Sequence, residues 1–181
     1  MSSLPNLLAI TRIVLAPLVI WLTIESGGEG ALAIAAVVFG VAAASDFLDG
    51  WVARKWNLAS EMGVFLDGTA DKLLVSGALL GLLMIDRVSV WAVFIILGRE
   101  FAVVTLRGLG AMNGAVMPPS KAGKVKANLQ FLAILLALLR DGERLGGLFL
   151  DEWAMWLAVL VTLWSGWGYL KPFLKAKPRL R

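Results

Sequence analysis

Four aspartates between residues 46 and 71 are the side chains of this sequence best suited to chemistry. The first two, Asp46 and Asp49, lie three residues apart, so on a helix they share one face. The second two, Asp67 and Asp71, lie four residues apart and share a face in the same way. Carboxylates that converge on a small volume repel one another unless a cation lies between them. Because every donor is an oxygen, Mg²⁺ or Mn²⁺ suits them better than zinc, and four carboxylates favour two ions.

Small residues accompany the aspartates in the same helical register. Gly50 and Ala53 continue the face of the first pair, and Gly63 precedes Asp67 by one turn. Residues this small let a ligand approach the backbone closely, and Arg54 could pair with a phosphate or with an aspartate. The alternative is that the aspartates cap helices or face water in a loop. That reading suits one aspartate but not four with this spacing, and acids between apolar segments are candidates for function.

The apolar segments around these motifs predict a membrane protein built from helices. Of the 181 residues, 59% are hydrophobic, and the mean hydropathy is +0.81, which is more apolar surface than a soluble domain needs. A short interfacial helix over residues 2–6 is expected to lead into the first of six spans. The fold class is therefore all-α: a single domain, residues 1–181, forming a bundle of six transmembrane helices. The spans are expected at residues 7–24, 31–51, 63–85, 89–110, 121–139 and 153–169.

Two residue types that are missing exclude whole classes of chemistry. The chain has no cysteine, which rules out disulfides, thiol catalysis and cysteine metal sites. It also has no histidine, which rules out a Ser–His triad and a histidine-ligated zinc. Any acid–base work must therefore fall to Asp, Glu, Lys or Tyr. The first apolar run lacks a basic start and a small-residue cleavage site, so no cleavable signal peptide is expected.

The distribution of charge predicts the orientation of the bundle. The net charge is +4 and the isoelectric point is about 9.7. With six spans, Arg54, Lys55, the basic residues of 121–126 and the basic tail all fall on one side. The positive-inside rule then places both termini and the aspartates at the cytoplasmic face of the inner membrane. Anionic membrane lipid and phosphate-bearing substrates explain the basic balance better than nucleic acid does, so no nucleic-acid partner is expected.

The aspartates form a long gapped pattern, D-x-x-D-G-x-x-A-R, eight further residues, and G-x-x-x-D-x-x-x-D. This pattern resembles the signature of the CDP-alcohol phosphotransferases, and within that family the subgroup whose acceptor is glycerol-3-phosphate. The similarity extends over nearly the whole chain, including Arg12, Gln130 and the run Gly98-Arg99-Glu100. One departure is Gly68, where the subgroup commonly has proline; glycine there removes no ligand. Every fixed position of the signature is matched: Asp46, Asp49, Gly50, Ala53, Arg54, Gly63, Asp67 and Asp71.

The resemblance implies a reaction and a role for each matched residue. The family transfers a phosphatidyl group from CDP-diacylglycerol to an alcohol and releases CMP. The resemblance implies that Asp46, Asp49 and Asp67 bind Mg²⁺ or Mn²⁺. It implies that Asp71 also touches metal and acts as the general base on the acceptor hydroxyl. The residues implied to bind CDP-diacylglycerol are Asp49, Gly50, Ala53, Arg54 and Gly63.

A glycerol-3-phosphate acceptor carries its own phosphate and therefore needs its own cations. We expect Arg99, Arg107, Lys124 and Lys126 to converge on the side of the aspartates. The two lysines are equally well explained as flanking positive charge. An ion pair between Arg99 and Glu100 is not expected, because adjacent residues point apart on a helix.

Several alternatives remain open from the sequence. Arg12 either reaches the headgroups from inside the first span or contributes near the site. The chain could be a sibling transferase with another acceptor, such as inositol phosphate, serine or phosphatidylglycerol. A divalent-cation transporter could use the same acids, but the gapped motif and the lack of a visible internal repeat argue against it. Gly77 and Gly81 form a G-x-x-x-G pattern, which indicates a close-packing helix face. A homodimer is a further expectation.

Overall fold

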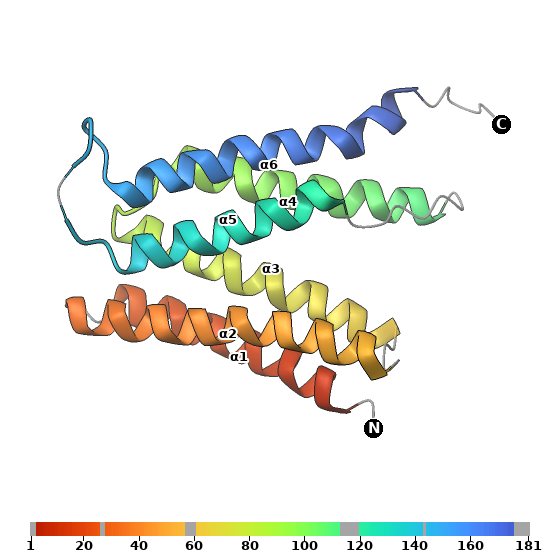
Figure 1. Ribbon diagram of the computed structural model, residues 1–181, viewed down its shortest axis with the longest axis horizontal. Helices are drawn as coiled ribbons and strands as arrows, with labels where there is room; N and C mark the ends of the chain where they lie inside the picture. The colour runs from red at the N-terminus through yellow and green to blue at the C-terminus, as the bar shows by residue number, and fades with distance from the viewer. Residues whose placement is uncertain (1–2, 26–27, 57–60, 113–119, 143, 176–181) are drawn as a thin grey trace.

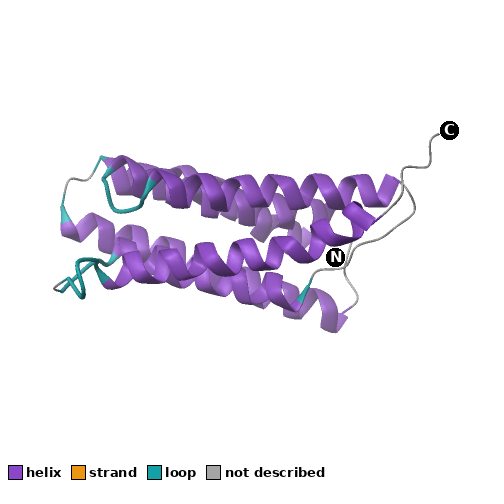
Figure 2. Ribbon diagram, turned by 90° about the horizontal axis from the view of Figure 1, so that it is seen from above, coloured by secondary structure: helices purple, strands orange, loops and turns teal. Residues whose placement is uncertain are grey.

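The computed structural model describes residues 3–25, 28–56, 61–112, 120–142 and 144–175, and this part of the chain is a bundle of six helices (Figure 1). Within it the only β-pairing is an isolated bridge between Leu145 and Leu148. Figure 2 shows the helices running along a common long axis. The all-α prediction is therefore confirmed. The helices are α1 Ser3–Ile24, α2 Glu29–Trp56, α3 Glu61–Met84, α4 Val90–Met112, α5 Lys121–Leu138 and α6 Leu150–Lys175.

The predicted spans coincide with these helices, apart from their ends. The separate interfacial helix expected over residues 2–6 is wrong, because from Ser3 onwards these residues form the first turn of α1. Pro5 is compatible with that continuity, since the first-turn N–H groups of a helix have no partner within the helix. The second helix continues past its expected end to Trp56, so the segment with Asp46 and Asp49 is helical. At α5 the Oγ of Ser120 accepts a hydrogen bond from the Gly123 N–H, which caps the helix start.

Helix α3 lies at the centre of the bundle and contacts α1, α2, α4 and α5. Its contact with α1 is close because two glycines leave room for the neighbouring helix. A Cβ atom at Gly77 would lie 3.1 Å from Ile20 Cδ1, and one at Gly81 would lie 3.1 Å from Thr23 Cβ. The G-x-x-x-G pattern therefore packs as predicted, and its partner is α1.

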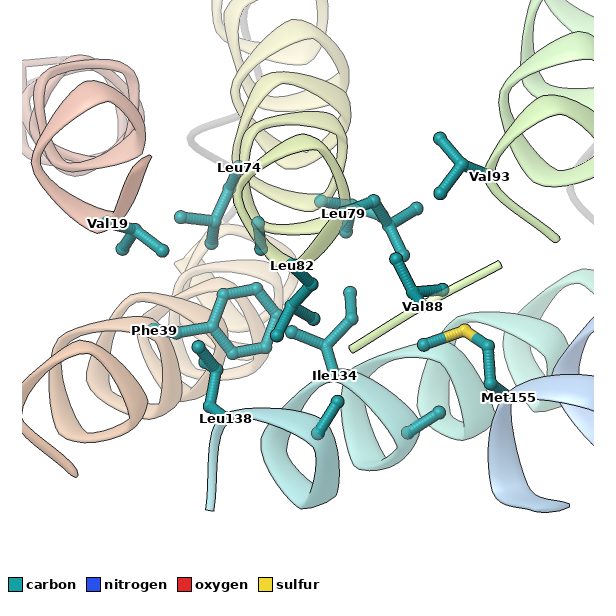
Figure 3. Close-up of a cluster of buried hydrophobic side chains, with 14 of the residues drawn as sticks. Val19, Phe39, Leu74, Leu79, Leu82, Val88, Val93, Ile134, Leu138 and Met155 are labelled. Carbon is teal, nitrogen blue, oxygen red and sulfur yellow. The ribbon is translucent and has the colours of Figure 1, made fainter. Parts of the chain in front are cut away.

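The buried apolar core draws on all six helices (Figure 3). Phe39 of α2, Leu82 of α3 and Ile134 of α5 are fully buried within it. Met155 brings α6 into the same cluster, and the rings of Phe39 and Phe131 lie 5.7 Å apart between centroids. This shared core holds α3 against the helices around it. It therefore fixes the position of the polar N-terminal half of α3.

The helices alternate in direction along the chain. As a result, the starts of α1, α3 and α5 lie at the same end as the ends of α2, α4 and α6 (right in Figure 1). This end, which we call the site end, holds the N-terminal half of α3 with Asp67 and Asp71. It also holds the first turns of α5 with Lys126. The alternation therefore brings the residues expected to act together to one end of the molecule.

The opposite end is tied together by arginines. Arg140 Nε and Nη2 bind the buried carboxylate of Asp151 at 2.7–3.1 Å, and Arg140 Nη2 also donates to the Arg87 carbonyl at 2.8 Å. Arg87 Nη1 in turn donates to the Ala137 carbonyl at 3.0 Å. The Arg140 guanidinium lies 4.5 Å from the centroid of the Phe149 ring. These contacts join the start of α4, the end of α5 and the start of α6.

Two stretches of the described helices are long and apolar enough to cross a membrane. They are Leu7–Ile24 in α1, with mean hydropathy 2.3, and Leu150–Lys171 in α6, with mean hydropathy 1.2. A third stretch, Gly30–Ser45 in α2, is apolar but shorter. Charged residues at the site end interrupt the apolar runs of α3, α4 and α5, and six spans are therefore not established by length and composition.

Candidate active site

Asp67 of α3 lies next to an arginine of α1. Arg12 Nη2 contacts Asp67 Oδ1 at 3.0 Å; the arginine side chain is 1% exposed, whereas that of Asp67 is 51% exposed. A buried guanidinium of this kind does not reach out to headgroups, so of the two alternatives for Arg12 the structure supports the one near the site. The ion pair orients Asp67 and leaves the aspartate accessible from outside the protein.

Asp71, one helical turn further along α3, lines a small cavity. The cavity has a volume of about 20 Å³, which is space for about one water molecule. Side chains of α4 and α5 form its other walls, among them Glu100, Lys126 and Gln130. The structure thus places the carboxylate proposed as a base in the same cavity as one of the cations expected to bind acceptor phosphate.

Glu100 is the common partner of two cations in this region. Its Oε1 atom accepts hydrogen bonds from Lys126 Nζ of α5 and, at 3.1 Å, from Arg99 Nη1. The expectation that Arg99 and Glu100 would not pair is therefore wrong. The physical reason is that the side chains of Arg99 and Glu100 are both long enough to bend towards each other when Lys126 binds the carboxylate.

Arg99 is turned towards α6. Its Nη2 donates to Ser165 Oγ at 2.9 Å, and its guanidinium lies 5.9 Å from the centre of the Tyr169 ring. A Cβ atom at Gly166 would lie 3.2 Å from Arg99 Cγ, so the arginine packs on bare backbone at that point. Arg99 is absent from the lining of the Asp71 cavity.

Arg107 lies in a second and larger hollow. A groove of about 550 Å³ runs between α3 and α4, and the stripe of α4 that lines it includes Phe101, Val104 and Arg107. Lys72 and Ser76 of α3 line both this groove and the Asp71 cavity, so they form the wall between the two. The groove walls are apolar apart from a few polar side chains, and its two charged residues, Lys72 and Arg107, are both cations.

The four predicted acceptor cations therefore do not converge. Lys126 faces Asp71, Arg99 binds α6, Arg107 lines the groove, and Lys124 is exposed at the start of α5. Reasoning from sequence missed the part played by Lys72, although its place directly after Asp71 was a signal. In the sequence, Glu100 stands out through the resemblance and as the neighbour of Arg99, and Gln130 through the resemblance alone; both line the cavity.

The nucleotide motif of α2 is described only as backbone. The helix continues through residues 46–56, so Asp46, Asp49, Gly50 and Ala53 share one face, as predicted from their spacing. The side chains of this segment, including Arg54, lie outside the described residues. Gly63 lies in the first turn of α3. Whether four carboxylates meet thus stays a prediction, and within the described side chains no group of three or more metal-ligating residues occurs.

The described half of the predicted metal site fits a hard divalent cation. Asp67 and Asp71 lie on successive turns of one helix face and offer only carboxylate oxygens. Asp67 is half exposed, so an ion can reach it. A Cβ atom added at Gly68, between the two aspartates, would have only the Lys72 ammonium within 4 Å, so the space beside them is open. Nothing in this donor set favours zinc or another soft metal.

Known proteins resemble this chain over most of its length. Residues 2–164 match the model of the CDP-alcohol phosphatidyltransferase family. A CDP-diacylglycerol–glycerol-3-phosphate 3-phosphatidyltransferase of Bacillus subtilis is 39% identical, over 93% of this chain and 94% of the relative. The enzyme of the same name from Rickettsia felis is 36% identical over 94% of each chain. A CMP-forming cardiolipin synthase of Streptomyces coelicolor is 31% identical, over 92% of this chain and 75% of the relative. Because the family match covers most of the sequence, this chain belongs to the CDP-alcohol phosphatidyltransferase family.

Proposed function

We propose that this chain is a CDP-diacylglycerol–glycerol-3-phosphate 3-phosphatidyltransferase. It would transfer the phosphatidyl group of CDP-diacylglycerol to glycerol-3-phosphate, giving phosphatidylglycerophosphate and CMP for phospholipid biosynthesis. Relatives with this name are 36–39% identical over nearly the whole chain. The structural observation that carries the proposal is the cavity shared by Asp71 and Lys126, because the acceptor needs a base for its hydroxyl and a cation for its phosphate.

Asp71 is proposed as the general base. The acceptor hydroxyl oxygen forms a bond to the phosphorus that carries diacylglycerol, and the bond from that phosphorus to the bridging oxygen breaks. CMP leaves with the bridging oxygen, and the hydroxyl proton passes to the Asp71 carboxylate. Lys126 is proposed to hold the acceptor phosphate, since it reaches the cavity from α5, whereas Lys72, the other lysine of the cavity, donates to the Gly68 carbonyl of its own helix at 2.7 Å. Arg107 and Lys124 lie outside that cavity and remain predicted phosphate-binding residues.

Asp46, Asp49, Asp67 and Asp71 are proposed to hold Mg²⁺ or Mn²⁺, with two ions favoured by the number of carboxylates. When bound, the metal would neutralise the diphosphate and stabilise the charge that develops on the departing CMP. Arg12 supports this arrangement by orienting Asp67 through their ion pair. For the nucleotide itself we propose the small and polar residues of α2 and early α3: Asp49, Gly50, Ala53, Arg54 and Gly63.

The donor is a lipid, and the groove between α3 and α4 is proposed to take its acyl chains. Phe65, Leu73, Phe101 and Val104 line it and are 45–70% exposed, so the groove opens sideways from the bundle. Lys72 lies between the groove and the Asp71 cavity. A lipid whose tail lies in the groove could therefore have its anionic head beside Lys72.

Two apolar helices and the family together indicate a membrane protein. We propose further that all six helices cross the inner membrane and that the site end is cytoplasmic. Large apolar side chains are exposed on every helix, among them Val14, Val37, Leu80, Phe94 and Leu160, as expected for surfaces that face lipid. The basic residues of 121–126, with Lys171 and Lys175 in the last turns of α6, belong to the site end. A homodimer stays a prediction that light scattering of the detergent-solubilised protein would check.

The test is CMP release by the purified protein in detergent, with CDP-diacylglycerol and one acceptor at a time. Glycerol-3-phosphate should support release, whereas inositol phosphate, serine and phosphatidylglycerol should not. Release with phosphatidylglycerol alone would instead identify a cardiolipin synthase, the function named for the Streptomyces relative. Absence of CMP release with every acceptor would overturn the transferase proposal and return the divalent-cation transporter to consideration.

A further inference from the structure

We propose that Glu100 is a positioning residue that holds the Lys126 ammonium in the Asp71 cavity, with Arg99 as its anchor on the other side. The inference rests on the proposed function, because it assigns to Lys126 the phosphate of the acceptor. It also gives Arg99 a different part from the one expected from sequence. Arg99 acts through Glu100 and Lys126 and does not itself touch the acceptor.

Lys126 needs a partner to stay where it is. Its side chain is 8% exposed and ends in a cavity that also contains Asp71 and Gln130. A lysine side chain has four rotatable bonds and loses more conformational entropy than most when it is fixed. The hydrogen bond to Glu100 Oε1 supplies that restraint from α4, a different helix from the one that carries the lysine. Glu100 therefore sets the position of the charge as well as neutralising part of it.

Glu100 is itself held by a rigid group. Arg99 Nη1 donates to the same Oε1 atom, and Arg99 is fixed in turn by Ser165 and by the bare backbone at Gly166. Ser165 Oγ also donates to the Thr162 carbonyl at 3.0 Å, so the serine has a defined rotamer. The chain of contacts runs from α6 through Arg99 and Glu100 to Lys126.

The same network returns to the cavity by a second route. Gln130, which lines the cavity from α5, donates from Nε2 to Thr162 Oγ1 of α6 at 3.0 Å. Tyr169 of α6 accepts a hydrogen bond at its hydroxyl from the backbone N–H of Ser120, at the start of α5. Helices α5 and α6 are thus fixed to each other on both sides of Lys126, so the backbone that carries the lysine cannot shift to follow a displaced Glu100.

Charge explains why Glu100 is needed and an amide would not serve. Arg99 and Lys126 both point at one carboxylate oxygen. Without the negative charge, two cations would face each other across a partly buried site and repel. The arginine is wedged against α6, so the flexible lysine would move out of the cavity instead.

The test is a comparison of the KM values for the two substrates in Glu100→Gln. Loss of one charge-assisted hydrogen bond should raise the KM for glycerol-3-phosphate about tenfold or more. The KM for CDP-diacylglycerol should change by less than about twofold, because the donor does not depend on Lys126. Glu100→Asp keeps the charge but shortens the side chain, so it should raise the KM for glycerol-3-phosphate by an intermediate amount. If Glu100→Gln does not fold, the KM values of Glu100→Asp test the proposal instead.

A double-mutant cycle with Lys126→Met shows whether Glu100 acts through the lysine. In the Lys126→Met background, Glu100→Gln should add less than about a twofold change to the acceptor KM. A full tenfold change in both backgrounds, or equal changes in the two substrate KM values, would overturn the proposal. A wild-type protein that turns over no glycerol-3-phosphate would instead contradict the proposed function, so the two failures are distinguishable.

The matched control is Asp151→Asn. Asp151 is the carboxylate of another buried arginine pair, at the opposite end of the bundle. Its loss should lower the thermal stability of the protein but leave the ratio of the two KM values unchanged. A change in that ratio in Asp151→Asn would show that the difference between the two KM values reflects a general loss of rigidity. That result would contradict the positioning role of Glu100.

Discussion

At the scale of single residues, Asp71 carries the most specific prediction. Asp71→Asn keeps the shape of the side chain but removes its ability to take the acceptor proton. Turnover should therefore fall by about 10²–10⁴-fold, while CDP-diacylglycerol binding survives through the remaining carboxylates. Asp46→Asn should instead weaken metal and donor binding together. Turnover and donor binding measured over a metal titration separate the two variants; near wild-type turnover of Asp71→Asn at high metal would make Asp71 a ligand only.

Sequence patterns predicted some of these residues well and others poorly, for a physical reason. The spacing of Asp67 and Asp71 predicts a shared helix face because that depends only on the local helix geometry, and the structure confirms it. The partners of Arg99 could not be predicted in this way. They depend on which helix lies opposite, on the gap at Gly166 and on the rotamer that a third charge, Lys126, induces. Periodicity within one helix contains none of this information.

At the scale of elements, the contact between α1 and α3 depends on the absence of side chains. Gly81→Leu would place its Cβ about 3.1 Å from Thr23 Cβ and force the two helices apart. We expect a loss of about 1–3 kcal/mol in stability, measured as a lower midpoint of thermal unfolding in detergent. Gly98→Leu on α4 is the control, because nothing lies within 4 Å of its Cβ position. Equal losses in both variants would contradict close packing as the cause.

The groove between α3 and α4 offers a second pair of matched variants. Gly108 of α4 lines the groove, yet a Cβ there also meets nothing within 4 Å, as at Gly98. Gly108→Leu should therefore fill the groove without straining the helix. The KM for long-chain CDP-diacylglycerol should rise several-fold, on the scale of a few buried methylene groups, and much less for a short-chain donor. The same increase in Gly98→Leu, or no dependence on chain length, would remove the groove from the donor site.

The positions of the helices were predictable because each helix contains a long apolar run that is visible in the hydropathy pattern. Each expected span contains a helix, and the errors lie at the polar ends. Residues 3–6 join α1 rather than forming their own helix, and α6 extends to Lys175, well past its expected end at residue 169. Backbone hydrogen bonding continues through polar residues, which a hydropathy pattern does not register.

At the scale of the whole molecule, the predicted metal site needs two helices to be in place together. Asp46 and Asp49 belong to α2, and Asp67 and Asp71 belong to α3. We expect CMP release to stop after exhaustive chelation and to return with Mg²⁺ or Mn²⁺, because the acids repel one another without a cation. The measurement is activity after chelation and after readdition of each ion. Full activity in the chelated protein would contradict a metal-dependent reaction.

The packing order of the helices could not be predicted from the sequence. The central position of α3, between α1 and the pair α4 and α5, follows from the fit of Gly77 and Gly81 to α1 and of Leu82 to Ile134. Such a fit depends on shapes that meet only in three dimensions. The direction of each helix was predictable, since short connections between six spans force neighbours in sequence to alternate.

The arginine cluster around Arg140 constrains how this bundle can move. It ties α4, α5 and α6 at the end away from Asp71, and Arg140 and Asp151 are 15% and 3% exposed. Breaking such a buried pair typically costs about 3–5 kcal/mol, so α4, α5 and α6 stay joined at this end. The groove between α3 and α4 already opens sideways, so any motion that widens it for a lipid with two acyl chains must be smallest at this end and grow towards the site end. The further the reaction centre lies from this joined end, the smaller is the change in the angle between α3 and α4 that substrate entry and product release require.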